Sequence, residues 1–214
     1  EITSVSKKVQ SLSDVPASAF VISADDIRRS GAQVLPDVLR MVPGIEVAQI
    51  DSTRYAVSSR GFNGRFSNKL QVLMDGRSIY HPQFSGVTWE TDPIALEDIE
   101  RIEVIRGPGA AMWGANAVGG VINIISKHSR QQQGTAVSAS VGNRGRSQLY
   151  ARQGWMLEDE STLKLSVHNR NGAASSKVSD GSRGEDAFHN TTLDLRYDHD
   201  LNAGEGFTLW AGAV

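Results

Sequence analysis

Hydrophobic and polar residues follow two different patterns along the chain, and the pattern changes near residue 130. Before it, short apolar runs of strand length are mixed with segments of helical spacing. After it, apolar and polar residues alternate over long segments separated by polar turns. Because successive side chains of a strand point to opposite faces, this second part is predicted to be β-structure with one apolar and one polar face.

Two short helices are predicted in the first part. Ser23 follows a strand at 19–22, with Asp26 three residues later and Gly31 at the far end. These are the residue types that begin and end a helix. A second helix is predicted over 34–42 from the helical spacing of its apolar residues, and Pro43-Gly44 ends it.

The remaining apolar runs of the first part predict a small mixed sheet. Asp75-Gly76 lies between two of these runs and is a strong hairpin signal. The alternation near Glu100 slips in phase at Arg101. The predicted strands cover 45–49, 55–59, 71–74, 78–80, 98–105 and 121–125, and the last is almost wholly apolar, which is typical of a central strand.

The second part predicts five strands, at 135–142, 146–156, 161–169, 190–199 and 206–214, after a polar linker at 126–134. A soluble sandwich would give the same alternation. Segments of about 9–11 residues, joined by short turns on one side and by a longer loop at 170–188, favour an outer-membrane barrel. The charged face would then line the lumen, and the apolar face would meet lipid.

Composition narrows the possible functions. The 214 residues contain no cysteine, which excludes disulfides, thiolate metal sites and a cysteine nucleophile within them. The net charge of −2 gives no overall basic field for nucleic acid. No apolar run reaches the roughly 18–20 residues of a spanning helix. The chain starts abruptly in polar sequence and ends inside a predicted strand, so we expect it to be truncated.

Three blocks of sequence carry a family resemblance. They are DIRRSGAQVLPDVLRMVPGIEV (26–47), SRGFNGRFSNKLQVLMDGRSIY (59–80) and LEDIERIEVIRGPGAAMWGANAVGGVINIISK (96–127). Together they resemble the plug domain of TonB-dependent outer-membrane receptors, which import siderophores, haem, cobalamin and some sugars. The resemblance covers about 18–130. It implies an α+β plug domain, a small mixed β-sheet with short helices, followed at 134–214 by the first antiparallel strands of a truncated outer-membrane β-barrel.

The resemblance implies transport without covalent chemistry, with no catalytic residue and no cofactor. Barrels of this family have about 22 strands and need a plug to close the lumen. The implied location is the bacterial outer membrane, with a periplasmic N-terminus. The implied partners are TonB with its inner-membrane energising complex, outer-membrane lipid, and a ligand such as a ferric siderophore, haem or cobalamin; nucleic acid is not among them.

The resemblance also implies roles for individual residues. Residues 1–17 would be the energy-coupling segment, which pairs with TonB by strand addition; a TonB box upstream of Glu1, or a frayed terminus, is the alternative. Arg60 and Arg106 would seat the plug against barrel glutamates, rather than being ordinary surface arginines. The coupling residues would be Ile2, Thr3, Ser4 and Val5. The apical loops would offer Phe62, Asn63, Arg65, Phe66, Tyr80, His81, Phe84 and Trp89 to ligand, unless these side chains pack against barrel loops.

Rival interpretations have less support in the residues. The glycines at 107–114 resemble a phosphate loop but lack its Lys-Ser/Thr pair. The five histidines show no metal-ligand spacing, although His81 in an apical loop could touch haem iron. No nucleophile motif supports a soluble periplasmic enzyme. A surface receptor for bacteriocin, phage or signalling, without transport, is the alternative function.

Overall fold

The computed structural model describes residues 18–59, 61, 64–66, 69–81, 83–91, 94–106, 113, 115–143, 145–157, 160–176, 179–202 and 205–214. The chain divides into two compact units. The first lies within 1–50, 54–92 and 96–126. The second comprises 51–53, 93–95 and 127–214. Among the described residues, no helix is both long enough and apolar enough to cross a membrane.

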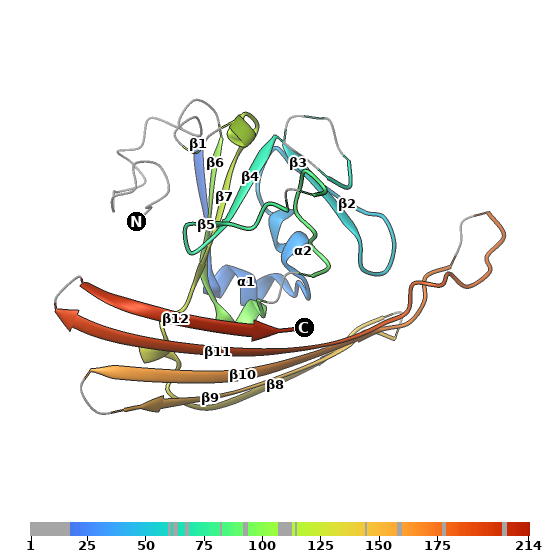
Figure 1. The fold of residues 1–214 in the computed structure, drawn as a ribbon. Coiled ribbons are helices and arrows are strands. Elements are labelled where there is room, and N and C mark those ends of the chain that lie inside the picture. Colours follow the sequence, from blue (N-terminus) through green and yellow to red (C-terminus); the bar gives the residue numbers. More distant parts are fainter. Residues whose placement is uncertain are drawn as a thin grey trace. The chain divides into compact units, whose positions relative to one another are not determined.

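The first unit is built on a five-stranded mixed sheet in the order β1-β6-β7-β4-β5 (Figure 1). Its strands are β1 (Ser18–Ser23), β4 (Leu70–Met74), β5 (Arg77–Ser78), β6 (Ile99–Arg106) and β7 (Gly120–Ser126). β4 and β7 run parallel, and the other pairs are antiparallel. β7 is central, as its apolar sequence predicts, and Val121, Ile122 and Ile124 are fully buried.

Two features of this sheet were read correctly from local sequence. The register of β6 against β7 shifts between Ile99 and Arg101, where the alternation slips in phase. Asp75 and Gly76 turn the chain from β4 to β5, both with positive φ. The return strand is shorter than predicted and begins one residue earlier: β5 covers Arg77–Ser78, whereas 78–80 was predicted.

Helix α1 (Ala24–Ser30) begins and ends at its predicted signals. The Ser23 hydroxyl accepts a hydrogen bond from the Asp26 N–H (3.2 Å), and the Asp26 carboxylate accepts from the Ser23 N–H (3.0 Å), which completes a capping box. The hydrogen bonds that the Ser23 hydroxyl (2.6 Å) and the Ser23 N–H donate to the Asp26 carboxylate hold its pKa below the ordinary value. Gly31 ends the helix in the left-handed conformation, φ 68°. Ile27 is the buried residue of the helix.

Replacing Ser23 with alanine should loosen α1, because the Asp26 N–H loses its acceptor at the exposed helix start. The expected cost is about 1 kcal/mol of local stability. Hydrogen exchange of the α1 amides measures it. Ser23→Thr keeps the hydroxyl and is the matched control; equal exchange in the alanine and threonine variants would contradict the role of the cap.

The second helix and the second hairpin complete the first unit. Helix α2 (Leu35–Leu39) is shorter than the predicted 34–42, because from Arg40 to Val42 each N–H bonds the carbonyl three residues back rather than four. Its apolar positions are buried as expected. The strands β2 (Ile45–Gln49) and β3 (Tyr55–Ser59) pair antiparallel as a separate two-stranded sheet. Single-turn helices η2 (Leu96–Asp98) and η4 (Ala115–Ala117) precede β6 and β7.

The second unit is an open antiparallel sheet in the order β12-β11-β10-β9-β8 (Figure 1). Its strands are β8 (Gly134–Val141), β9 (Ser147–Met156), β10 (Ser161–Gly172), β11 (Phe188–Asn202) and β12 (Glu205–Ala213). All five predicted strands are present, and β10 and β11 are longer than predicted. The polar linker is not irregular throughout, because residues Ser129–Gln132 form the single-turn helix η5.

Candidate functional site

In the sheet of the second unit, one face carries polar side chains that are buried, and the other face carries apolar side chains that are exposed. On β10, the side chains of Thr162, Lys164, Ser166 and His168 are buried, whereas the intervening Leu165 and Val167 are 37% and 39% exposed. β11 repeats this arrangement in register, with Leu195 opposite Leu165. A soluble sandwich would bury the apolar residues instead. The exposed apolar face therefore needs an apolar environment.

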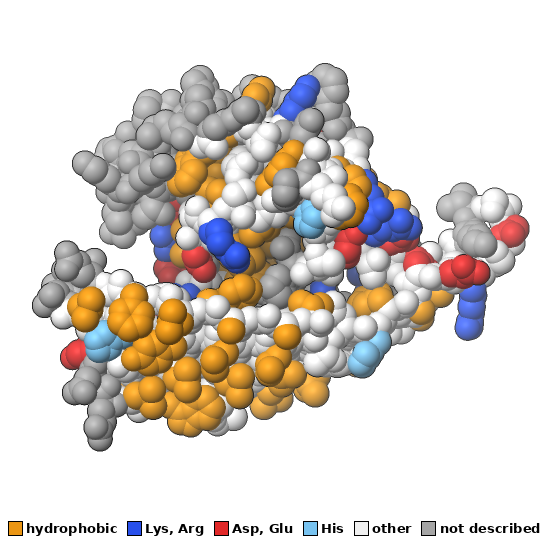
Figure 2. Space-filling view, in the orientation of Figure 1, with side chains coloured by type: hydrophobic (Ala, Val, Ile, Leu, Met, Phe, Trp, Pro, Cys, Tyr) orange, Lys and Arg blue, Asp and Glu red, His pale blue; other side chains and the backbone are white. Residues whose placement is uncertain are grey.

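The exposed apolar face is continuous across the strands, and Figure 2 shows its hydrophobic side chains gathered together. Strand pairing places these residues in rows that run from strand to strand. Soluble monomers rarely expose large contiguous apolar patches, and those that they expose usually mark contact with a protein or a membrane. The face contains Val137, Val141, Leu149, Trp155, Leu165, Val167, Leu193, Leu195, Phe207 and Leu209.

Both ends of this apolar face change character. Near the β9–β10 and β11–β12 turns, Trp155 and Tyr197 lie in the row through Leu163. The Phe207 ring is tilted against that of Tyr197, with the ring centroids 5.9 Å apart. Toward the loop at 173–187, this face becomes polar on β10 and β11, where Asn169 donates a hydrogen bond to the Thr191 hydroxyl (2.8 Å). Aromatic residues at an edge of an apolar band are typical of a barrel surface where lipid meets water.

The opposite, polar face pairs its charges internally. Lys164 Nζ lies 2.5 Å from an Asp194 oxygen, and Arg196 Nε donates to Asp198 (2.8 Å). All four side chains are at least four-fifths buried. A buried charge is tolerated only with such a partner. This face can therefore line a polar, confined interior.

The first unit gathers part of the predicted ligand-contact residues. The rings of Phe66 and Phe84 stack with centroids 5.4 Å apart, and the His81 ring lies 4.8 Å from that of Phe84. The Arg65 guanidinium lies 4.9 Å from the Phe66 ring centre and pairs with Glu90 (2.7 Å). Phe84 is 47% exposed. The cluster thus presents an aromatic surface beside a charged pair.

Other predicted residues lie elsewhere. Trp89 is only 7% exposed, so its ring is buried and is not presented at the surface. Tyr80 is partly buried near the cluster, after β5. Phe62 and Asn63 lie outside the described residues, as do Arg60 and the coupling residues Ile2, Thr3, Ser4 and Val5.

Arg106 is described, at the end of β6. One of its guanidinium nitrogens donates to the Pro43 carbonyl, and a Cβ on Gly44 would lie 2.7 Å from the same nitrogen. Arg106 therefore supports the turn that follows α2 within the first unit. Its predicted pairing with a barrel glutamate stays a prediction.

A protein-family comparison now identifies the first unit. The TonB-dependent Receptor Plug Domain family model matches residues 11–121, which is half of the chain. The chain belongs to the TonB-dependent receptor family. The α+β plug followed by antiparallel strands, predicted from sequence, is the fold of this family, and the sheet here is open rather than closed.

Similar curated sequences include vitamin B12 transporters. The chain is 41% identical over 136 residues to "Vitamin B12 transporter BtuB" of Vibrio vulnificus, covering 63% of this chain and 22% of that protein. It is 30% identical over 213 residues to the Vibrio cholerae protein of the same name, covering 95% and 33%. The receptor chain described here thus spans a third or less of the length of these relatives.

Similar solved structures show the same fold. The pyoverdine-bound receptor FpvA of Pseudomonas aeruginosa matches with a TM-score of 0.73 and 19% identity, over 99% of this chain and 26% of that one. The ferric-catecholate import receptor Fiu of E. coli matches with a TM-score of 0.71 and 23% identity, over 94% and 27%. At these identities the likeness establishes architecture and not ligand.

Sequence reasoning missed the polar residues that organise the receptor's second unit. Asp198 accepts hydrogen bonds from Ser129 and from Arg196. Asp186 accepts from the N–H groups of Ser52 and Ser175, both at 2.8 Å, and hydrogen bonds from Ser175 and Ser52 hold its pKa well below the ordinary value. In the sequence, the only signal for these roles is that Asp198 and Asp186 are charged residues in polar segments. Their partners are distant along the chain: Ser129 lies about 70 residues from Asp198, and Ser52 lies about 130 residues from Asp186.

Proposed function

We propose that this chain is the plug and the first barrel strands of a receptor that imports a ligand across the bacterial outer membrane with energy supplied through TonB. The observation that carries the proposal is the sheet with buried charges and exposed aliphatic residues, joined in one chain to a plug of this family. Such a sheet is stable when lipid covers the apolar face and a closed barrel encloses the polar one.

The proposed topology follows from the faces of the sheet. Residues 134–214 form barrel strands, with the short turns toward the periplasm and the loop at 173–187 toward the exterior. Residues 18–130 form the plug in the lumen. Residues 1–17 are the periplasmic coupling segment, in which Ile2, Thr3, Ser4 and Val5 add a strand to TonB. Lipid, TonB and its inner-membrane energising complex are the partners that this arrangement requires.

Two groups of plug residues have separate proposed roles. The apical cluster of Phe66, Phe84 and His81 contacts ligand, since stacked rings supply apolar area. Arg60 and Arg106 seat the plug against carboxylates of the barrel.

The ligand class is best approached from the similar sequences. The curated relatives with the identities given above are named as vitamin B12 transporters, whereas the siderophore receptors share only the fold. Cobalamin is therefore the first ligand to test. Ferric siderophores and haem are the next candidates.

Uptake by the full-length receptor tests the function. A strain lacking the gene is complemented with the wild type or with a variant lacking Ile2 to Val5, and labelled cobalamin, ferric siderophores and haem are supplied. We expect energised uptake of one ligand with the wild type. The deletion should abolish that uptake and leave surface binding intact, because binding needs no energy, whereas uptake needs the energy delivered through the strand that the deleted residues add to TonB.

The same assay distinguishes the rival functions. Uptake that persists in a strain without TonB would contradict energy coupling, and uptake unaffected by the deletion would place the coupling segment elsewhere. Ligand or bacteriocin binding with no uptake of any compound would favour a surface receptor without transport.

Replacing Phe84 with alanine should weaken surface binding of the ligand several-fold, because the stacked and half-exposed ring is worth about 0.5–1.5 kcal/mol beyond its buried area. Equilibrium binding to whole cells measures the effect. Met41, 37% exposed on the turn after α2, gives the control substitution Met41→Ala. If Phe84→Ala and Met41→Ala bind the ligand with equal affinity, the aromatic cluster is not part of the ligand site.

A further inference from the structure

The segment between β7 and β8 is built into the second unit. η5 contacts β9, β10 and β11, and the side chains of Ser129 and Gln132 are fully buried. An Arg152 guanidinium nitrogen donates to the Gln132 carbonyl. A Cβ on Gly154 would lie 2.1 Å from that carbonyl oxygen, so the glycine is what lets the segment approach β9 so closely.

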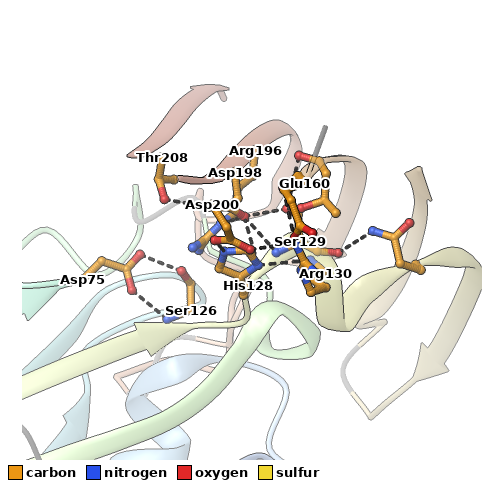
Figure 3. A network of polar contacts seen from close by, with 12 residues as sticks. Asp75, Ser126, His128, Ser129, Arg130, Glu160, Arg196, Asp198, Asp200 and Thr208 are labelled. Carbon is orange, nitrogen blue, oxygen red and sulfur yellow. Dashed lines mark hydrogen bonds and ion pairs between the residues drawn. The ribbon is translucent and has the colours of Figure 1, made fainter. Parts of the chain in front are cut away.

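Asp198 is the centre of this attachment (Figure 3). Its Oδ2 accepts from the Ser129 N–H (2.9 Å), the Ser129 hydroxyl (2.5 Å) and Arg196 Nε (2.8 Å). Its Oδ1 accepts from the Thr208 hydroxyl (2.5 Å). With 1% of its surface exposed, the carboxylate depends on these donors, since an unpaired buried charge would be strongly unfavourable.

Two ion pairs of Arg130, which are more exposed than the contacts of Asp198, also hold η5. Arg130 Nη2 lies 2.8 Å from oxygens of both Glu160 and Asp200. These carboxylates come from the β9–β10 turn and from the end of β11, so one arginine bridges two places in the sheet. Both sides of η5 are thereby attached to the same unit.

The end of β7 is held within the first unit by hydrogen bonds that are more exposed than those of Asp198. Asp75 Oδ1 accepts from the Ser126 N–H (2.8 Å), and Oδ2 accepts from the Ser126 hydroxyl (2.6 Å). The Asp75 N–H in turn donates to the Ile124 carbonyl (2.9 Å). Figure 3 shows this pair. Ser126 therefore belongs to the plug sheet, and Ser129 belongs to the barrel strands.

We propose that Asp198 is a positioning residue that keeps η5 attached to the barrel strands, and that the short stretch between Ser126 and Ser129 is the joint at which the plug end of the chain changes direction. Within this stretch His128 caps η5 and lies 3.7 Å from Asp198 and 3.5 Å from Asp200. Three peptide steps separate Ser126 from Ser129, which limits the reach of the joint to about 11 Å. While Asp75 keeps its hydrogen bonds to Ser126 and Asp198 keeps its hydrogen bonds to Ser129, the end of β7 stays within about 11 Å of η5. The consequence for uptake rests on the transport function proposed above.

Hydrogen exchange in the full-length, ligand-free receptor tests the attachment without any transport. In Asp198→Asn, one acceptor oxygen becomes an NH₂ group that faces donors. We expect the amides of 128–133 to exchange about tenfold faster or more, because hydrogen bonds to a charged group are lost. The amides of β1, β6 and β7 should keep their rates. Asp180→Asn, in the loop between β10 and β11, is the matched control and should change none of these rates.

Ser129→Ala keeps the result decisive if the first variant folds poorly. It removes the hydroxyl bond to Asp198 and leaves Arg196 and Thr208 in place to satisfy the carboxylate. A smaller acceleration, confined to 128–133, is expected. Wild-type exchange rates at 128–133 in a folded Ser129→Ala receptor would overturn the proposal.

The uptake assay separates positioning from mere stability. Without the Asp198 contacts, η5 is left with the contacts of Arg130 and with the Arg152 bond to Gln132, so the joint lengthens and part of the movement of the plug is taken up by slack chain. We expect Asp198→Asn and, to a smaller degree, Ser129→Ala to retain ligand binding and to lose energised uptake. Faster exchange with unchanged uptake would overturn the positioning role. Absence of uptake in the wild type would reject the transport function but not the attachment, which exchange measures alone.

Discussion

A lysine in place of Leu195 is expected to prevent stable insertion of the receptor into the outer membrane. Leu195 lies on the apolar face, opposite Leu165 on one neighbouring strand and Ala211 on the other. A lysine facing lipid near the middle of the bilayer costs about 2–4 kcal/mol. In a soluble sandwich, lysine at a position that is 39% exposed would change stability by no more than about 0.5 kcal/mol. One substitution therefore separates the two environments.

The measurement is the folded fraction of full-length receptor in lipid vesicles as urea is increased, together with its yield in the outer-membrane fraction of cells. Asn169→Lys is the control, because Asn169 lies on the same face where that face has become polar. The control should insert normally. Equal urea midpoints for the two variants would show that Leu195 does not face lipid.

The five barrel strands could be predicted because alternation specifies them directly. In β10, each of Leu163, Leu165 and Val167 is followed by a residue of opposite polarity, so the strand and its two faces are evident from sequence. The ends of β11 were missed because the alternation is interrupted there, with Phe188 among the polar positions and His189 and His199 among the apolar ones. There the pairing alone defines the strand, with Gly172 opposite Phe188 and Asp200 opposite Gly206.

The attachment of the linker could not be predicted, because nothing in a local polar sequence indicates its distant partners. Ser129 lies in a run that looks irregular, and its acceptor Asp198 is 69 residues later. Trp89 shows the opposite limit. An aromatic residue in a polar loop suggested exposure, but the fold of the first unit gives its ring a buried place. Motifs found the plug, whereas tertiary contacts decide which of its residues face outward.

The second large effect is expected at Gly120, the first residue of β7. Its φ of 145° is rarely adopted by residues with a side chain, and a Cβ there would lie 2.6 Å from the Ile105 carbonyl oxygen of β6. Because β7 is the centre of the plug sheet, Gly120→Ala should separate β7 from β6 at this end. We expect a loss of about 3 kcal/mol or more of plug stability, from backbone strain and from the contact together.

Hydrogen exchange of the β6 and β7 amides in the full-length receptor measures this loss. Gly76→Ala is the matched control, since Gly76 also has a positive φ, 77°, but no atom lies within 4 Å of its Cβ position. The control keeps the backbone strain and lacks the collision, so it should cost about 1 kcal/mol. If both variants lose the same stability, the collision with Ile105 contributes nothing, and the close approach of β7 to β6 does not determine the plug sheet.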